Sequence, residues 1–200
     1  MTTTATVFGR RLGAVLFAAL FLSALPGAAS EIRIPEKPLP NESPRGAVLA
    51  GDEALFLAQH SCRDPDRTPL TAWTPGPAEI ARLEKLLPKY MAGLKATPRD
   101  YKPLHEYYRQ YIGTVRNGKK RICVNLFHYN FVRHSLERPE IMPDVKKTVQ
   151  KGRRAEDFWK YEPISVMDGG ASFFTVQFDV ATGTFLYLGV NGMSQGRFSE

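Results

Sequence analysis

The clearest pattern in the chain is an alternation of side-chain types near its C-terminus. Between Ser172 and Asp179 apolar residues recur at every second position, which is the period of a strand. The residues expected on one face are Phe174, Val176 and Phe178, and those on the other are Phe173, Thr175 and Gln177. Ile164–Asp168 and Thr184–Val190 have similar character, so we expect three consecutive strands joined by glycine-containing turns.

A second alternating region predicts a hairpin in the middle of the chain. Tyr108–Arg116 and Lys119–Phe127 flank Asn117-Gly118, the dipeptide that favours a type I′ turn between two strands. One face of the second strand should carry Ile122, Val124 and Leu126. The hairpin and the C-terminal strands together predict a sheet of about five antiparallel strands.

Helical spacing occurs upstream of the hairpin. Apolar residues at intervals of three and four predict a main helix over Pro77–Leu94, and Pro88 predicts a kink or break near Leu87. A shorter helix is expected over Glu53–His60, capped by Asp52.

These elements predict an α+β fold in which an N-terminal helix packs on the antiparallel sheet, a plan similar to cystatin-like or PepSY-like domains. A proline-rich leader, residues 31–45, should be extended and loosely packed, and residues 46–200 should form a single domain. For residues 129–160 the sequence predicts loops with a short polar helix.

The first thirty residues have the pattern of a secretory signal peptide. Arg10 and Arg11 precede an apolar run from Leu12 to Leu25, and small residues follow up to Ser30. The alternative is an uncleaved membrane anchor, but the run is short for a span of about 20 residues. We expect a periplasmic or secreted protein without a stable membrane anchor after cleavage.

Export changes the interpretation of the two cysteines. In an oxidising compartment Cys62 and Cys123 are expected to form a disulfide, and the alternative is two unpaired thiols. Neither cysteine has a second cysteine or a histidine at the spacing of metal ligands, so we expect no metal site. No cofactor motif is present in the sequence either.

The chain has an excess of positive charge, and the excess is local. Residues 99–160 contain 15 Lys and Arg against 7 Asp and Glu. Within this region, aromatic and cationic residues of the hairpin form the predicted ligand-binding surface: Tyr108, Arg109, Lys119, Lys120 and Arg121. Such a surface could hold an acidic envelope component or another periplasmic protein; the alternative is that tyrosines face the core and lysines solubilise the hairpin tip. Nucleic acid is not an expected partner.

Candidate catalytic groups are sparse. Asp168 precedes two glycines and could act with His105 or His128 in a hydrolase of envelope polymers, or it could simply begin the turn. Convergence of two or more of these residues and Glu106 within hydrogen-bonding distance in a cleft would favour the enzyme. Their dispersal would favour a non-enzymatic binding or interaction module, which is the leading hypothesis.

The C-terminal half also carries a series of turn and strand-edge motifs: Tyr107–Gly113, Asn117–Lys120 with Asn125, Asp168–Gly170, Phe178-Asp179 with Thr182–Phe185, and Asn191-Gly192. Together these motifs resemble uncharacterised secreted proteins of Gram-negative bacteria. The resemblance brings no particular activity with it.

The signal-peptide interpretation predicts that the exported protein lacks Met1 to about Ser30. Cell fractionation followed by intact-mass measurement should find the shortened chain outside the inner membrane. Full-length protein retained in the inner membrane would contradict this prediction.

Overall fold

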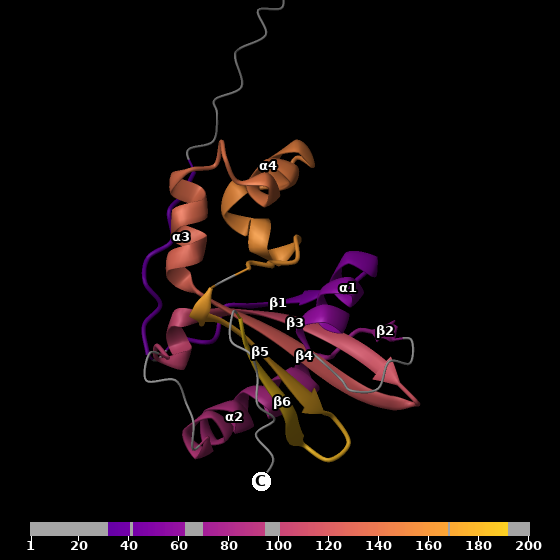
Figure 1. Ribbon diagram of the computed structural model, residues 1–200. Coiled ribbons are helices and arrows are strands. Elements are labelled where there is room, and N and C mark those ends of the chain that lie inside the picture. Colours follow the sequence, from indigo (N-terminus) through magenta and orange to yellow (C-terminus); the bar gives the residue numbers. More distant parts are fainter. Residues whose placement is uncertain (1–31, 41, 63–69, 95–100, 168, 192–200) are drawn as a thin grey trace, which may run out of the picture. The chain divides into compact units, whose positions relative to one another are not determined.

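The computed structural model describes residues 32–40, 42–62, 70–94, 101–167 and 169–191. The chain divides into two units, residues 1–31 and 32–200, and the following account concerns the second. Its elements are β1 (Gly46–Leu49), α1 (Asp52–Ser61), β2 (Thr71–Trp73), α2 (Pro77–Gly93), η1 (Leu104–Glu106), β3 (Tyr107–Arg116), β4 (Lys119–His128), α3 (Tyr129–Glu137), α4 (Pro143–Gln150), η2 (Ala155–Lys160), β5 (Gly170–Asp179) and β6 (Thr184–Asn191). The predicted α+β fold is confirmed (Figure 1).

The sheet is mixed and has six strands. Its order is β1-β3-β4-β5-β6, and β2 pairs with the part of β3 that β1 leaves uncovered. β1 runs parallel to β3, whereas the other pairs are antiparallel. The sheet is therefore mixed rather than purely antiparallel, because the short strand β1 joins β3 in parallel orientation.

The β3–β4 hairpin matches its prediction closely. Arg116 pairs with Lys119, and the two residues between them have positive φ, 49° at Asn117 and 73° at Gly118. Both angles are those that a type I′ turn requires. A second glycine, Gly113, permits β2 to approach, because a Cβ atom there would collide with the Trp73 carbonyl group.

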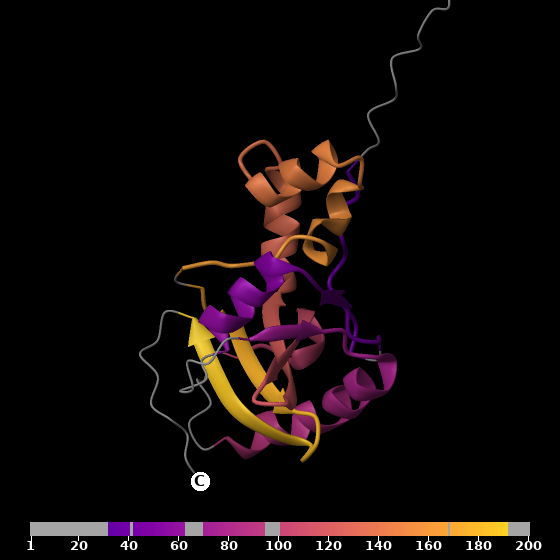
Figure 2. The same ribbon diagram turned by 90° about the vertical axis from the view of Figure 1, so that its right-hand side faces the viewer.

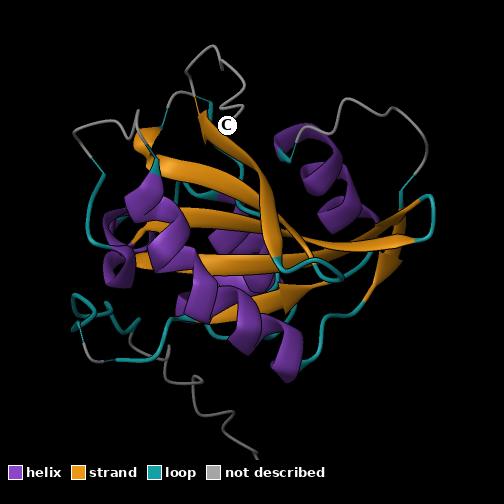
Figure 3. Cartoon of the chain, turned by 90° about the horizontal axis from the view of Figure 1, so that it is seen from below, coloured by secondary structure: helices purple, strands orange, loops and turns teal. Residues whose placement is uncertain are grey.

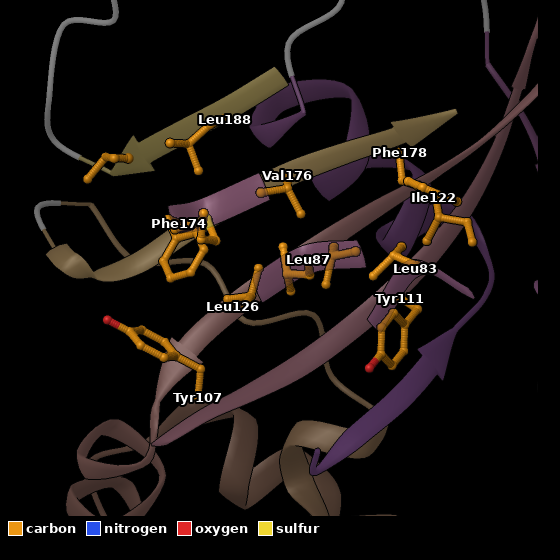
Figure 4. Packing of buried hydrophobic residues seen from close by; sticks show 13 residues of the cluster. Leu83, Leu87, Tyr107, Tyr111, Ile122, Leu126, Phe174, Val176, Phe178 and Leu188 are labelled. Atoms are coloured by element: carbon orange, nitrogen blue, oxygen red, sulfur yellow. The ribbon is translucent and has the colours of Figure 1, made fainter. Parts of the chain in front are cut away.

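The first face of the sheet packs against α2, which lies across the strands (Figure 3). Leu83 and Leu87 of α2 are fully buried against the alternating residues of β4 and β5 (Figure 4). The Glu79 carboxylate accepts a hydrogen bond of 3.0 Å from the Gly76 backbone N–H at the start of the helix. α2 continues through Pro88 without the predicted break, and Pro88 is exposed on its outer side.

The opposite face is covered by α1 in one part and by α3, α4 and η2 in another (Figure 2). α1 is fastened by the Cys62–Cys123 disulfide, whose Cα atoms are 5.9 Å apart, so the predicted bond is confirmed. Most of residues 129–160 form helices, contrary to the expectation of loops with one short helix. α1 begins after Gly51, so Asp52 lies in its first turn rather than at the cap.

A pair of buried amides holds the helical cover on this face. Asn125 donates to the Gln110 side-chain oxygen at 3.1 Å, and Gln110 donates to the backbone carbonyl groups of Trp159 and Glu162 at 2.7 and 2.8 Å. Both amides also bond the backbone of Ile164, at 3.0 and 2.7 Å. These bonds take the place of strand pairing, and the predicted strand over Ile164–Asp168 is absent from the described residues of that segment.

The described residues of the proline-rich leader, 32–40 and 42–45, contain no helix or strand, but they are not loosely packed. Ile32 packs on the helical cover, and Pro38 is buried. The Arg45 guanidinium donates to the Glu36 backbone carbonyl group at 3.1 Å and to the Tyr108 hydroxyl at 2.7 Å. Among the residues that the structure describes, no helix is both long and apolar enough to cross a membrane.

The disulfide closes a loop with a sequence separation of 61 residues. Replacing both cysteines, Cys62→Ala with Cys123→Ala, should lower the free energy of unfolding by about 4 kcal/mol, because the unfolded chain regains its freedom. Urea titration measures this difference, and reduced wild type should resemble the double variant. Equal stability of wild type and the double variant would contradict the structural role of the bond.

Candidate functional site

The cationic residues predicted from the sequence lie at the tip of the β3–β4 hairpin. Lys119 and Lys120 are exposed there, and Arg121 is partly buried. The positive charge is therefore displayed on a short turn whose backbone geometry is fixed by Asn117 and Gly118.

Trp73 supports the tip from the side of β2. Its indole N–H donates to the carbonyl groups of Thr114 and Arg121, each at 3.1 Å, so the ring is fixed across both strands of the hairpin. The Lys120 ammonium lies 4.9 Å from the centre of this ring, within the range of a cation–π contact. No local pattern in the sequence predicts this contact, because β2 is far from the hairpin in the chain.

The β5–β6 turn supports the tip from the other side. The Val180 N–H donates to the Lys120 carbonyl at 3.2 Å, and the Val180 carbonyl accepts from Arg82 of α2 at 2.8 Å. Asp179 is the single acidic residue in the tip segments 113–122 and 178–185, which contain four Lys and Arg. Burial raises the pKa of Asp179, but hydrogen bonds from Thr182 and Ala181 outweigh burial and leave it below its usual value.

Tyr108 and Arg109, the other two predicted ligand-binding residues, do not share this surface. Both are 2% exposed, and they lie on opposite faces of β3. Alternation places Tyr108 in the core beneath the helical cover, where its ring meets Trp159. The grouping of all five residues into one surface was therefore wrong, because the hairpin is buried on both faces away from its tip.

Arg109 has a structural set of partners. Its Nε donates to Glu84 of α2 at 2.9 Å, and its terminal nitrogens donate to the carbonyl groups of Tyr107 and Leu104 at 2.5 and 3.1 Å. The Tyr111 hydroxyl donates to the same Glu84 oxygen at 2.8 Å. These bonds join α2 and η1 to β3.

An open groove of about 630 Å³ lies beside this ion pair. It is lined by leader, α2 and η1 residues together with Arg109: Pro40, Glu42, Pro44, Glu84, Lys85, Pro88, Leu104 and His105. Both carboxylates of the groove are already paired, Glu84 with Arg109 and Glu42 with Arg45 at 3.2 Å. The groove thus has surface for contact but little uncompensated charge.

A buried cluster forms where β3 and β4 meet the leader. The Glu106 carboxylate accepts hydrogen bonds from His128 Nε2 at 2.9 Å and from the Lys37 ammonium at 2.7 Å. Burial would raise the pKa of Glu106, but the bonds from Lys37 and His128 outweigh burial and hold the pKa below its usual value. His105 is farther away, with Nε2 at 3.9 Å from the same carboxylate.

The second ring nitrogen of His128 is also engaged. The Asn130 N–H donates to Nδ1 at 3.3 Å, which caps α3 and assigns the ring proton to Nε2. Glu106 and His128 therefore converge, but both nitrogens of the ring serve the fold, and neither residue lines the groove. Asp168, the proposed catalytic carboxylate, lies outside the described residues.

A third charged cluster, which the sequence did not predict, surrounds Glu162. Glu162 has a side chain only 1% exposed, and its two oxygens pair with Lys151 and Lys147, each at 2.7 Å. Lys147 also bonds Glu53 of α1 at 2.9 Å, so the cluster links α4 to α1. A single glutamate between Tyr161 and Pro163 gives no signal of this role in the sequence.

No group of three or more histidine, cysteine or acidic residues placed to hold a metal occurs in the described part of the chain. No family model matches the chain, and no curated protein or solved structure matches it either. The resemblance to secreted proteins of Gram-negative bacteria therefore stays a prediction.

The Glu106 cluster should make stability depend on pH. Glu106→Gln should lower the free energy of unfolding by roughly 1.5–3 kcal/mol near neutral pH, because charged hydrogen bonds are lost. Since the folded-state pKa is depressed, this deficit should be complete above the pKa of an unfolded glutamate, about 4.3, and shrink as pH falls through the folded-state pKa.

Urea titrations of wild type and variant at a series of pH values measure this deficit. The matched control is Glu137→Gln, which removes the exposed pair with Arg133 and should cost less than about 1 kcal/mol. A deficit that does not diminish in acid would contradict the ionic role of Glu106.

Proposed function

We propose that this protein is an exported, non-enzymatic binding module whose hairpin tip holds an acidic polymer of the cell envelope. The observation that carries the proposal is the concentration of cations at the tip, where Lys119, Lys120 and Arg121 meet one acidic residue, Asp179. Export rests on the signal-peptide pattern of the first thirty residues.

The tip has the physical properties of a polyanion contact. Lys119 and Lys120 are exposed and have no ion-pair partner among the described residues, so contact with a polyanion breaks no ion pair of these two lysines. The turn is fixed by its backbone angles, and Trp73 positions Lys120, so little order has to be gained on binding. An aromatic ring beside the cations also offers a stacking surface for sugar rings.

The alternative, a hydrolase of envelope polymers, has less support. Of its candidate groups, Glu106 and His128 meet, but Glu106 also accepts from Lys37, and the second ring nitrogen of His128 accepts from Asn130. A catalytic base needs a free nitrogen or oxygen directed at the substrate or its nucleophile. Neither ring nitrogen of His128 is free for this role, and neither residue lines the described groove.

The proposal predicts that Lys119→Ala, Lys120→Ala and Arg121→Ala together weaken binding to anionic envelope polysaccharide at least about tenfold at low salt. Binding of wild type should itself fall as salt rises, because exposed charges are screened over about 10 Å at 0.1 M. Titration calorimetry at low and high salt measures both effects.

The matched control removes three exposed lysines elsewhere, Lys85→Ala, Lys89→Ala and Lys102→Ala. This variant has the same net charge change and should retain most of the affinity. Equal weakening by both triple variants would show that binding depends on net charge and that the tip is not a specific site. Binding that does not change with salt concentration would overturn the proposal.

A further inference from the structure

The outer surface of α4 combines exposed apolar and cationic side chains. Ile141, in the turn before the helix, is 57% exposed, and Val149, in its last turn, is 51% exposed. Lys146 is exposed between them and lies one turn before Val149, so these two residues share a face of the helix.

The inner side of α4 is fully used. Val145 and Thr148 are buried, and Lys147 and Lys151 bond the buried carboxylate of Glu162 at 2.7 Å each. The direction in which α4 faces is therefore fixed by packing and by ion pairs. Lys146 and Val149 are held outward as a consequence.

The chain after α4 adds to this surface. Gly152, with φ of 71°, ends the helix, and its N–H donates to the Val149 carbonyl at 2.9 Å. The next residue, Arg153, places its guanidinium 4.0 Å from the centre of the Tyr161 ring, which is itself 44% exposed. An exposed aromatic ring and a cation thus lie beside the C-terminal end of α4.

The charge of the segment is strongly positive. Residues 138–154 contain six Lys and Arg against two acidic residues, Glu140 and Asp144, and three of the six pair with carboxylates outside the segment: Lys147 and Lys151 with Glu162, and Arg154 with Glu156. Lys146 and Arg153 have no such ion pair among the described residues. Burial, followed by the charge of Glu162, raises the pKa of Asp144. Figures 1 and 2 show α4 at the end of the unit away from the β5–β6 turn.

We propose that the α4 surface, formed by Ile141, Lys146, Val149, Arg153 and Tyr161, docks on an anionic lipid bilayer. Aliphatic side chains held outward gain by entering the boundary between headgroups and acyl chains, while cations bind the negative headgroups. Tyrosine is favoured at the same boundary. A soluble polyanion would satisfy the cations but leave Ile141 and Val149 in water.

This contact is separate from the polymer site at the hairpin tip and does not rest on it. The tip segments 113–122 and 178–185 expose lysines, and none of their described large hydrophobic residues is exposed. The two surfaces therefore differ in the ligand chemistry that each accommodates.

The test is co-sedimentation with phosphatidylcholine vesicles prepared with and without phosphatidylglycerol, using exported protein with the same N-terminus in every variant. Wild type should bind the anionic vesicles and fail to bind the neutral ones. Ile141→Ser with Val149→Ser should lower the partition constant about tenfold or more. Lys146→Ala with Arg153→Ala should lower it by a similar factor.

Two control variants match these changes. Leu186→Ser removes an apolar side chain that is 48% exposed on β6, and Lys85→Ala with Lys89→Ala removes two exposed cations of α2. Both should bind anionic vesicles as wild type does. Near-ultraviolet circular dichroism checks that every variant is folded, and the apolar and charge pairs test the surface independently.

Undiminished vesicle binding by either α4 pair would overturn the proposal, as would equal binding to neutral vesicles. Loss of vesicle binding on Lys119→Ala with Lys120→Ala, with both α4 pairs unaffected, would assign lipid contact to the tip. Ile141→Ser with Val149→Ser could also lower binding to vesicles and binding to a soluble anionic polysaccharide by the same factor. That result would overturn the proposal and make α4 a polymer site.

Discussion

The structure depends on two buried amides in the middle of the sheet. Gln110 and Asn125 are directly opposite each other on β3 and β4, and they bond each other and the backbone of the segment that crosses above them. Removing either amide would leave buried polar groups without partners, each costing about 1–3 kcal/mol. This pair therefore fixes which face of the sheet receives α3, α4 and η2, and the directions of the outward side chains follow from it.

The buried charges are committed in the same way. Glu84 joins α2 to β3 through Arg109, Glu106 joins the leader to β4 through His128, and Glu162 joins α4 to the rest of the cover. Each of these carboxylates holds two elements of the fold together, and Glu106 and Glu162 are buried. The proposed binding surfaces, at the hairpin tip and on α4, consist instead of exposed side chains that include cations. This distribution favours the proposed binding function over the proposed hydrolase.

Local patterns in the sequence were sufficient where the structure is local. The alternation in β4 and β5, the turn at Asn117-Gly118 and the stripe of α2 each depend on residues close in the chain, and the disulfide follows from the number of cysteines and the expected compartment. The failures involve distant partners. β1 is four residues long and exists through pairing with β3, while the segment at Ile164 is held by amides from other strands. Burial of Tyr108 and Arg109 depends on covers that the sequence did not reveal.

The central claim is that ligands meet exposed charge at the hairpin tip while the buried pairs serve the fold. Hydrogen exchange along the chain, with and without a saturating anionic envelope polysaccharide, tests this claim most directly. The account predicts slower exchange in residues 114–121 and 179–184, with unchanged exchange around the groove. Protection centred on residues 84–88 and 104–109, beside Glu84 and His105, would contradict it.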